Sequence, residues 1–367
     1  MKPKLLCILH NSPPVHGAAK VGDFIFSSEK LKEVFECRFI TIKSSDTIGD
    51  IGKISLKKFY LVAELYFKVL WALLTFQPQK IYFTASIRGV AFYRDLLVST
   101  LWKFYKLFKS VEVYYHYHTM GIDEFVSISK CNLKLTRFFI KDVNLLLLSP
   151  LLEKDTLKVK SYKKIHFLPN GVEDPMVKEN FEMYMAEKYS KIGTIEVLYL
   201  AHMMKEKGYL EVLELAKNTK GQNICYHFAG NWKDVESKSE FFEFIKEYRL
   251  EEIVIYHGFV SGNQKIDLFK KAHVFLYPTK FEAFGIAIIE ALSFGVPVIA
   301  TDEGSIPYIL DKESGIVLHD INKLSESLEQ AKQNLLNKGV AMHCRQRYLD
   351  NFSIGQFENN LVNTLKG

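Results

Sequence analysis

Two carboxylates flank a glycine in the segment Tyr277–Ala291, in the order Glu282, Gly285 and Glu290. The apolar run before this segment predicts a buried strand that ends at Tyr277, and a helix is expected to begin near Gly285. The first N–H groups of a helix lack helical partners, and the helix dipole places partial positive charge there. A pyrophosphate suits such a site, and Gly285 would let it approach the backbone closely.

Glu282 precedes the expected helix, whereas Glu290 lies inside it, so the two carboxylates can reach different parts of one ligand. Carboxylates accept pairs of hydroxyl hydrogen bonds, which sugars and riboses offer. The alternative is structural, because a glutamate near a helix N-terminus complements the dipole and a glutamate within a helix is usually solvated. The pair alone leaves both interpretations open.

Further polar candidates follow other predicted strands. Lys205 and Lys207 lie between a strand and a helix, and Lys207 could neutralise a diphosphate, although both could equally be surface lysines. His116 and His118 lie two residues apart at a strand end, hence on the same side. A metal could bind two such histidines, but no carboxylate or cysteine companion is evident, so we predict none. Gly17 lies in the loop 11–19, which follows the first strand and is therefore expected to face the ligand-binding cleft.

Short apolar runs alternate with longer mixed segments along the whole chain, which predicts an α/β fold with parallel sheets covered on both faces. The expected strands are Leu5–Leu9, Arg38–Ile42, Lys80–Thr84, Val111–Tyr117, Leu145–Ser149, Glu196–Leu200, Ile224–Ala229, Val254–His257, Val274–Tyr277 and Pro297–Ala300. The expected helices are Asp23–Phe35, Lys57–Phe76, Ala91–Phe108, Asn132–Lys141, Tyr209–Lys217, Lys238–Tyr248, Asn263–Lys271, Gly285–Phe294 and Ile321–Lys338.

The length of 367 residues favours two domains, and the segment Leu168–Pro175 is the expected join. Asn170-Gly171 favours a turn with positive φ. We therefore predict two Rossmann-like doubly wound domains, 1–170 and 171–351, with an interdomain cleft that faces the carboxyl ends of both sets of strands. A final helical pattern at 352–367 is expected to join the first domain.

The two halves of the chain carry opposite net charge. Residues 1–170 hold 26 Lys/Arg against 14 Asp/Glu, and the remainder carries net negative charge. An anionic membrane surface is favoured over nucleic acid as the partner, since aromatics mix with lysines at 57–71 and 101–109 and no recognition-helix motif appears. Core-facing helices with solvated lysines are the alternative. The five scattered cysteines indicate reduced thiols without a zinc site, and we expect a cytoplasmic protein.

The segment with the two glutamates resembles the Glu-x7-Glu motif of retaining GT-B glycosyltransferases of family 4, or glycosyl transferases group 1, of the bacterial surface-polysaccharide type. The likeness extends over the second half and more loosely over the first. Its further motifs are Phe228-Ala229-Gly230, Tyr256–Val260, Leu268–Thr279, Val296–Thr301, Gly304–Pro307, Gly315–Val317 and Pro169–Val172.

The resemblance implies roles for individual residues. Glu290 would bind the nucleotide ribose and Glu282 the donor sugar, with the backbone of Phe284, Gly285 and Ile286 near the sugar and phosphates. Lys207 would bind the leaving phosphate, and His118, with His116 as second choice, would lie near the reacting sugar. The chain departs from the family at His202, which stands where an arginine is usual, and its glycine loop retains only Gly17.

The resemblance implies a retaining hexosyltransferase (EC 2.4) without a bound metal or other cofactor. It would move sugar from a UDP- or GDP-linked donor to an acceptor hydroxyl, on a lipid-linked or other saccharide, at the inner face of a bacterial membrane. A sugar-nucleotide epimerase, a phosphorylase and a partner subunit that binds nucleotide sugar without turnover are the alternatives. The loss of a glycine from the glycine loop and the presence of His202 instead of arginine favour the partner subunit.

Overall fold

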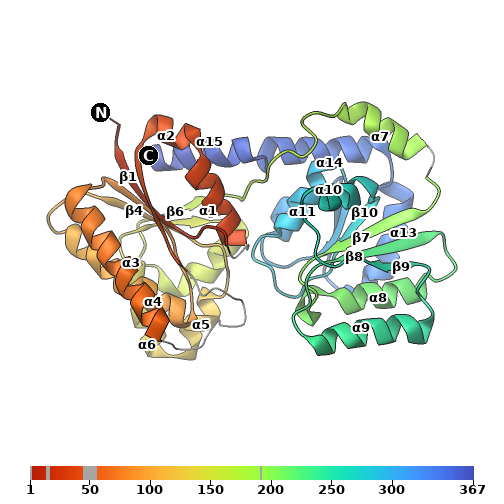
Figure 1. The fold of residues 1–367 in the computed structure, drawn as a ribbon, viewed down its shortest axis with the longest axis horizontal. Coiled ribbons are helices and arrows are strands. Elements are labelled where there is room, and N and C mark those ends of the chain that lie inside the picture. Colours follow the sequence, from red (N-terminus) through yellow and green to blue (C-terminus); the bar gives the residue numbers. More distant parts are fainter. Residues whose placement is uncertain (1, 14–16, 44–55, 191) are drawn as a thin grey trace. The chain divides into compact units, whose positions relative to one another are not determined.

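The computed structural model describes residues 2–13, 17–43, 56–190 and 192–367. The chain divides into two compact units, the first formed by residues 1–170 with Ile354–Gly367 and the second by Gly171–Ser353. Each unit contains a six-stranded sheet whose paired strands run parallel, and Figure 1 shows helices around both sheets. The α/β fold class predicted from the alternating pattern is confirmed.

The first sheet has the strand order β2-β1-β3-β4-β5-β6. Its strands are β1 (Lys4–Leu9), β2 (Glu36–Thr41), β3 (Lys80–Thr84), β4 (Glu112–His116), β5 (Asn144–Leu147) and β6 (Lys164–Phe167). The helices of this unit are α1 (Gly17–Ser27), α2 (Glu29–Val34), α3 (Leu56–Thr75), α4 (Gly89–Tyr105), α5 (Ile122–Ile128), α6 (Lys130–Phe139), the 3-10 segment η2 (Pro150–Val159) and α15 (Ile354–Lys366).

Helices cover both faces of the first sheet. On one face, apolar side chains of β1 pack with α1, α2 and α15, so Phe357 and Leu361 from the end of the chain share a core with Leu5. On the other face, Trp102 of α4 donates a hydrogen bond to the buried Tyr115 hydroxyl at 3.0 Å. The carboxy-terminal helix therefore completes the hydrophobic core of the first unit, and Figure 1 shows α15 beside α2.

The second sheet has the order β12-β11-β10-β7-β8-β9. Its strands are β7 (Ile195–Leu200), β8 (Ile224–Ala229), β9 (Val254–Tyr256), β10 (Val274–Tyr277), β11 (Val298–Thr301) and β12 (Gly315–Leu318). The helical elements are α7 (Phe181–Ser190), η3 (Lys205–Lys207), α8 (Tyr209–Asn218), α9 (Val235–Tyr248), α10 (Gly262–Lys271), α11 (Ile286–Ser293), α12 (Ile306–Ile309), η4 (Ile321–Lys323), α13 (Leu324–Asn334) and α14 (Lys338–Asn351).

Alternation along β7 and β8 assigns their side chains to two faces. Val197, Tyr199, Tyr226 and Phe228 belong to one core with side chains of α8, α9 and α13. The intervening residues of both strands therefore point to the opposite face, where Figure 1 shows α10 and α11. The carboxyl end of β10 leads into the loop with Glu282, which positions the candidate site described below.

Three sequence expectations were wrong. The helix expected at Asp23–Phe35 is split, because the Ser28 hydroxyl accepts a hydrogen bond from Leu31 N at 3.2 Å and begins α2. Asn337 likewise accepts from Val340 N at 3.0 Å and begins α14, so the helix expected at Ile321–Lys338 ends early.

The third error concerns the join between the halves. Neither Asn170 nor Gly171 has positive φ. Directly after this dipeptide, Val172 N donates to Phe352 O at 3.0 Å, and Val172 forms a β-bridge with Ser353. Pairing with a distant segment thus replaces the turn that the Asn-Gly dipeptide favours.

Among the residues that the structure describes, none of the helices combines the length and the apolar character needed to cross a membrane.

Candidate active site

Three loops at the carboxyl edge of the second sheet are joined by backbone hydrogen bonds. Lys280 N, after β10, donates to Glu206 O, after β7, at 2.8 Å. Ser305 N, after β11, donates to Ala283 O at 3.1 Å. Parallel strands bring their carboxyl ends to one edge, so segments far apart in sequence build a single surface there.

Two glycines allow these loops to lie so close. Gly208 has φ 82°, and a Cβ there would fall 2.1 Å from Pro278 O. Gly304 has φ 54°, and a Cβ there would fall 2.0 Å from Glu282 O. A side chain at either position would force the loops apart, because real Cβ atoms do not approach carbonyl oxygens at such distances.

Lys207 and Glu282 form an ion pair where the loops meet. Lys207 Nζ lies 2.9 Å from Glu282 Oε2 and donates to Phe281 O at 2.8 Å. Glu282 Oε2 also accepts from the Tyr277 hydroxyl at 2.6 Å, and its Oε1 accepts from Phe284 N at 3.2 Å. Both charged side chains are only about a fifth exposed, at 19% and 18%. The carboxylate and the ammonium are therefore held in a defined geometry.

The surroundings keep Glu282 ionised. Burial by itself would raise the pKa of Glu282, but the charge of Lys207 and hydrogen bonds from Tyr277, Lys207 and Phe284 N outweigh it. The net result is a pKa below the ordinary value for glutamate. Burial raises the pKa of Tyr277 well above its ordinary value, so this phenol remains a hydrogen-bond donor.

Helix α11 begins beside the pair. Gly285 precedes it with φ 99°, and a Cβ there would lie 2.9 Å from Ile288 Cδ1. Further along this helix, Glu290 Oε1 lies 2.6 Å from Lys265 Nζ of α10, and their side chains are 15% and 21% exposed. Glu290 is thus a second partly buried carboxylate with a cationic partner, on the same helix whose first N–H groups can bind an anion.

The other predicted site residues are distributed over both units. His202 follows β7 in the second unit, and its side chain is exposed. Gly17 is the first residue of α1 in the first unit and is also exposed, while Pro14–His16 of its loop lie outside the described residues. His118 follows β4, also in the first unit.

His116 and His118 of the first unit lie together, as alternation predicts. Their ring centroids are 4.0 Å apart. His116 is fully buried, with Nδ1 2.6 Å from the Tyr82 hydroxyl, and burial lowers its pKa to about 3. A neutral imidazole behind His118 can fix the position of that ring without adding charge.

Sequence reasoning assigned no role to three residues of this region. Tyr277 was identified only as a strand end, although its hydroxyl reaches Glu282. Gly304 and Lys265 act through tertiary packing, which no local pattern reveals. A tyrosine directly before a polar loop was the available signal for the first, because a buried phenol needs a hydrogen-bond partner.

The two helix-covered parallel sheets have the GT-B architecture. The chain aligns over 100% of its length with 100% of a solved Anabaena protein, HepE, in complex with UDP and glucose, at a TM-score of 0.69 and 14% identity. This likeness establishes the architecture, two Rossmann-like domains.

The second unit is identified more closely by sequence. Residues 183–346, most of this unit, match the family model described as "Glycosyl transferases group 1". An uncharacterized 41.2 kDa protein in the cps region of Klebsiella pneumoniae is 27% identical over 47% of this chain and 46% of its own length. The capsular polysaccharide biosynthesis glycosyltransferase CapM of Staphylococcus aureus is 25% identical over 54% of each chain. These matches span about half the length of either relative.

Proposed function

We propose that this protein is a glycosyltransferase that moves a sugar from a nucleoside-diphosphate sugar to an acceptor hydroxyl with retention of configuration. The observation that carries the proposal is the Lys207–Glu282 pair at the start of α11. It combines a fixed cation, helix N–H groups and hydrogen-bond-accepting carboxylates in a unit that matches the glycosyl transferases group 1 family model.

The chemistry follows from where charge develops. As the bond between sugar and phosphate breaks, the sugar gains oxocarbenium character and the departing diphosphate gains negative charge. A fixed positive potential at that diphosphate lowers the barrier, and Lys207 with the first N–H groups of α11 supplies it. Lys207 donates to Phe281 O and Glu282, which uses two of its three N–H donors and leaves one for a phosphate oxygen.

The carboxylates have separate roles in this proposal. Glu282 is ionised and held by Tyr277 and Phe284 N, so it can orient donor-sugar hydroxyls. Glu290, whose carboxylate forms an ion pair with Lys265, would accept the ribose hydroxyls of the nucleotide. His118 would assist at the sugar, and His202, Gly17 and the backbone of Ile286 would contribute to donor binding. The reaction would need no bound metal or other cofactor.

We further propose a lipid-linked saccharide acceptor at the inner face of a bacterial membrane. A stripe of exposed apolar side chains runs along α3 at helical spacing, formed by Tyr60, Phe67, Trp71 and Leu74, each more than 60% exposed. A groove beside the stripe, between α3 and the edge strand β2, is lined by Phe67, Trp71 and Lys43. Apolar side chains with nearby cations are typical of surfaces that enter an anionic lipid interface.

The relatives support a role in surface polysaccharide synthesis, because one is a capsular polysaccharide glycosyltransferase and another lies in a cps region. The donor base is proposed to be uracil or guanine. HepE was solved with UDP, which makes UDP-sugars the first donors to test. The cytoplasm, with peripheral attachment to the membrane, is the proposed location.

A thermal-shift screen of nucleotides and nucleotide sugars, followed by turnover assays with the best ligand, tests the proposal. The true donor should raise the melting temperature, because it binds only the native state. Donor consumption with release of nucleoside diphosphate supports sugar transfer. Release of an isomerised nucleotide sugar would indicate an epimerase, and binding without any turnover would indicate a partner subunit. The absence of a shift with every nucleotide sugar would overturn the proposed donor site.

A further inference from the structure

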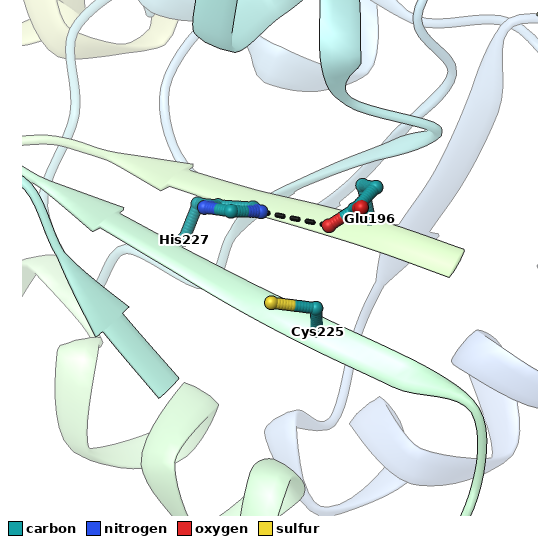
Figure 2. Close-up of side chains that lie close together, drawn as sticks. All are labelled: Glu196, Cys225 and His227. Carbon is teal, nitrogen blue, oxygen red and sulfur yellow. Dashed lines mark hydrogen bonds and ion pairs between the residues drawn. The ribbon is translucent and has the colours of Figure 1, made fainter. Parts of the chain in front are cut away.

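Three side chains of metal-ligating type lie together on one face of the second sheet. They are Glu196 of β7 and Cys225 and His227 of β8, drawn in Figure 2. Cys225 and His227 are two residues apart on one strand, and Glu196 is the register partner of Cys225. Both relationships place side chains on the same face, so the strand pairing itself brings the three together.

The distances suit one small ion. His227 Nε2 lies 2.7 Å from Glu196 Oε2, and the three possible ligand atoms all lie within 4.8 Å of one another. His227 is buried, whereas Glu196 and Cys225 are partly exposed, which leaves a route from solvent. Figure 2 shows the imidazole directed at the carboxylate, with the cysteine sulfur below them on β8.

We propose that Glu196, Cys225 and His227 bind a divalent transition-metal ion of the zinc class, with water as the fourth ligand. Thiolate, imidazole and carboxylate all bind such ions, and three protein ligands with one water complete a four-coordinate site. On binding, the Cys225 thiol would lose its proton to solvent. His227 would bind the ion through Nε2 and carry its proton on Nδ1.

A neighbouring histidine supports this arrangement. His227 Nδ1 lies 2.8 Å from His257 Nε2, just after β9. A metal-bound histidine usually donates its other ring N–H to an acceptor, which fixes the ring and the tautomer. His257 Nε2 can accept a hydrogen bond from that N–H, so the site would connect β7, β8 and β9 at the edge of the sheet.

Two features must change when the ion enters. The hydrogen-bonded His227 and Glu196 atoms would move apart by about 0.6 Å, since ligand distances near 2.0–2.1 Å and tetrahedral angles separate them by about 3.3 Å. Lys271 Nζ, 3.2 Å from Glu196 Oε1, would give up part of its ion pair. Lys271 is 51% exposed and can swing into solvent, so it would compete with the metal without blocking the site.

The location indicates a structural ion. Glu196 is the second residue of β7 and Cys225 the second of β8, so the cluster lies toward the amino ends of these strands. Lys207 and Glu282 lie beyond the carboxyl ends of β7 and β10. The ion would therefore stabilise the second unit and take no part in sugar transfer, and the inference is independent of the proposed function. The spacing of the five cysteines did not indicate a metal site, because the cluster forms only when β7 pairs with β8.

Cobalt titration of the metal-free protein tests the site. A thiolate ligand gives a sulfur-to-cobalt charge-transfer band, and tetrahedral Co²⁺ gives strong visible bands. We expect both with the wild type, one equivalent of bound ion, and a higher melting temperature with Zn²⁺. Cys225→Ser should abolish the charge-transfer band and lower zinc affinity at least tenfold. Cys131→Ser, which changes an exposed cysteine, should alter neither.

Lys271→Met provides a second arm that removes no ligand. If Lys271 competes for Glu196, this variant should bind Zn²⁺ more tightly than the wild type, by a few-fold. Cooperative melting without metal must show that each variant is folded. The proposal is overturned if the folded wild type gives no cobalt charge-transfer band, or if the band survives in Cys225→Ser. The Glu196–His227–His257 contacts would then be only a hydrogen-bonded network.

Discussion

Lys207 and Glu282 are 75 residues apart in sequence, yet the ammonium lies 2.9 Å from the carboxylate. The pair joins the loop after β7 to the loop after β10, and the backbone hydrogen bond from Lys280 N to Glu206 O also connects these loops. Because Glu282 is ionised and held by Tyr277 and Phe284 N, neither charge has to reorganise when a ligand binds. This preorganisation is the property that a site for a departing diphosphate requires.

Replacing either member of the pair should remove most transfer activity. We expect Lys207→Ala and Glu282→Ala each to lower kcat by about 10²–10³-fold, the usual effect of losing one preorganised electrostatic group. The double variant should lose much less than the product of the two, since both act through one pair. Lys280→Ala is the control, because Lys280 lies in the same loop but pairs with Glu211. Turnover of both single variants at the wild-type rate would refute this site.

The two glutamates should be distinguishable by calorimetry. Glu290→Gln should weaken binding of the free nucleotide and of the nucleotide sugar by a similar factor, about 10-fold or more, because hydrogen bonds to a charged group contribute about 1.5–3 kcal/mol. Glu282→Gln should weaken binding of the nucleotide sugar while leaving that of the nucleotide near wild type. Glu214→Gln, on the surface of α8, serves as the control. The opposite pattern would exchange the proposed roles.

Gly304 offers a test of the loop packing. Gly304→Ala would place a methyl group against Glu282 O, so we expect the loop with Glu282 to move and activity to fall at least tenfold. Gly221→Ala is matched, because Gly221 also has positive φ, at 88°, but open space around its Cβ position. Both variants should lose about 1–2 kcal/mol of stability from the left-handed backbone. Equal activities in the two variants would contradict the packing argument.

Most strands of both sheets were predictable, because parallel strands that are buried on two faces form continuous apolar runs in the sequence. β3, β8 and β10 have the predicted boundaries. β6 and β12 were not predicted. Lys164–Phe167 includes charged and polar residues at a sheet edge, and Gly315–Leu318 begins with a glycine that leaves an apolar run of only three residues. The helix breaks at Ser28 and Asn337 depend on side-chain caps that override the apolar period.

The site was only partly predictable, for a related reason. Glu282, Gly285 and Glu290 are close in sequence, and a strand–loop–helix pattern indicates their surroundings. Lys265 reaches Glu290 from another helix, and that contact depends on how α10 packs against the sheet. The cluster of Glu196 with His227 likewise depends on strand register. Local patterns carry no information about either.

Acid should destabilise the first unit through His116. The pKa of this buried imidazole is lowered to about 3, against about 6.5 in an unfolded chain. Between these values the unfolded state binds a proton that the folded state does not, so the free energy of unfolding falls as pH falls below about 6.5. At pH 5 the loss attributable to His116 is about 2 kcal/mol.

Denaturant unfolding at pH 7 and pH 5 would check this expectation. His116→Gln removes the titrating group, so its stability should decline less between the two values than that of the wild type. It will also be less stable at pH 7 if the contact with Tyr82 is lost, which is why the difference between pH values is compared. His319→Gln, at a histidine whose side chain is 81% exposed, should behave like the wild type. An unchanged pH dependence in His116→Gln would contradict the assignment.

Membrane attachment should depend on the exposed stripe of α3. In flotation with anionic vesicles at low salt, we expect the wild type to bind and the double variant Phe67→Ser/Trp71→Ser to bind at least tenfold more weakly. Burial of each large apolar side chain contributes about 1.5–3 kcal/mol, so losing two leaves mainly electrostatic attraction. That remainder should disappear at high salt, where charges are screened.

The control for the membrane test is Phe242→Ser on α9, which removes an exposed aromatic side chain from the second unit and should bind like the wild type. Because residues 1–170 hold 26 Lys/Arg against 14 Asp/Glu, neutral vesicles should bind the wild type less than anionic ones. Equal flotation of the wild type and the stripe variant would show that α3 does not enter the lipid interface. The stripe would then need another partner, since large apolar patches on a protein surface usually mark an interaction site.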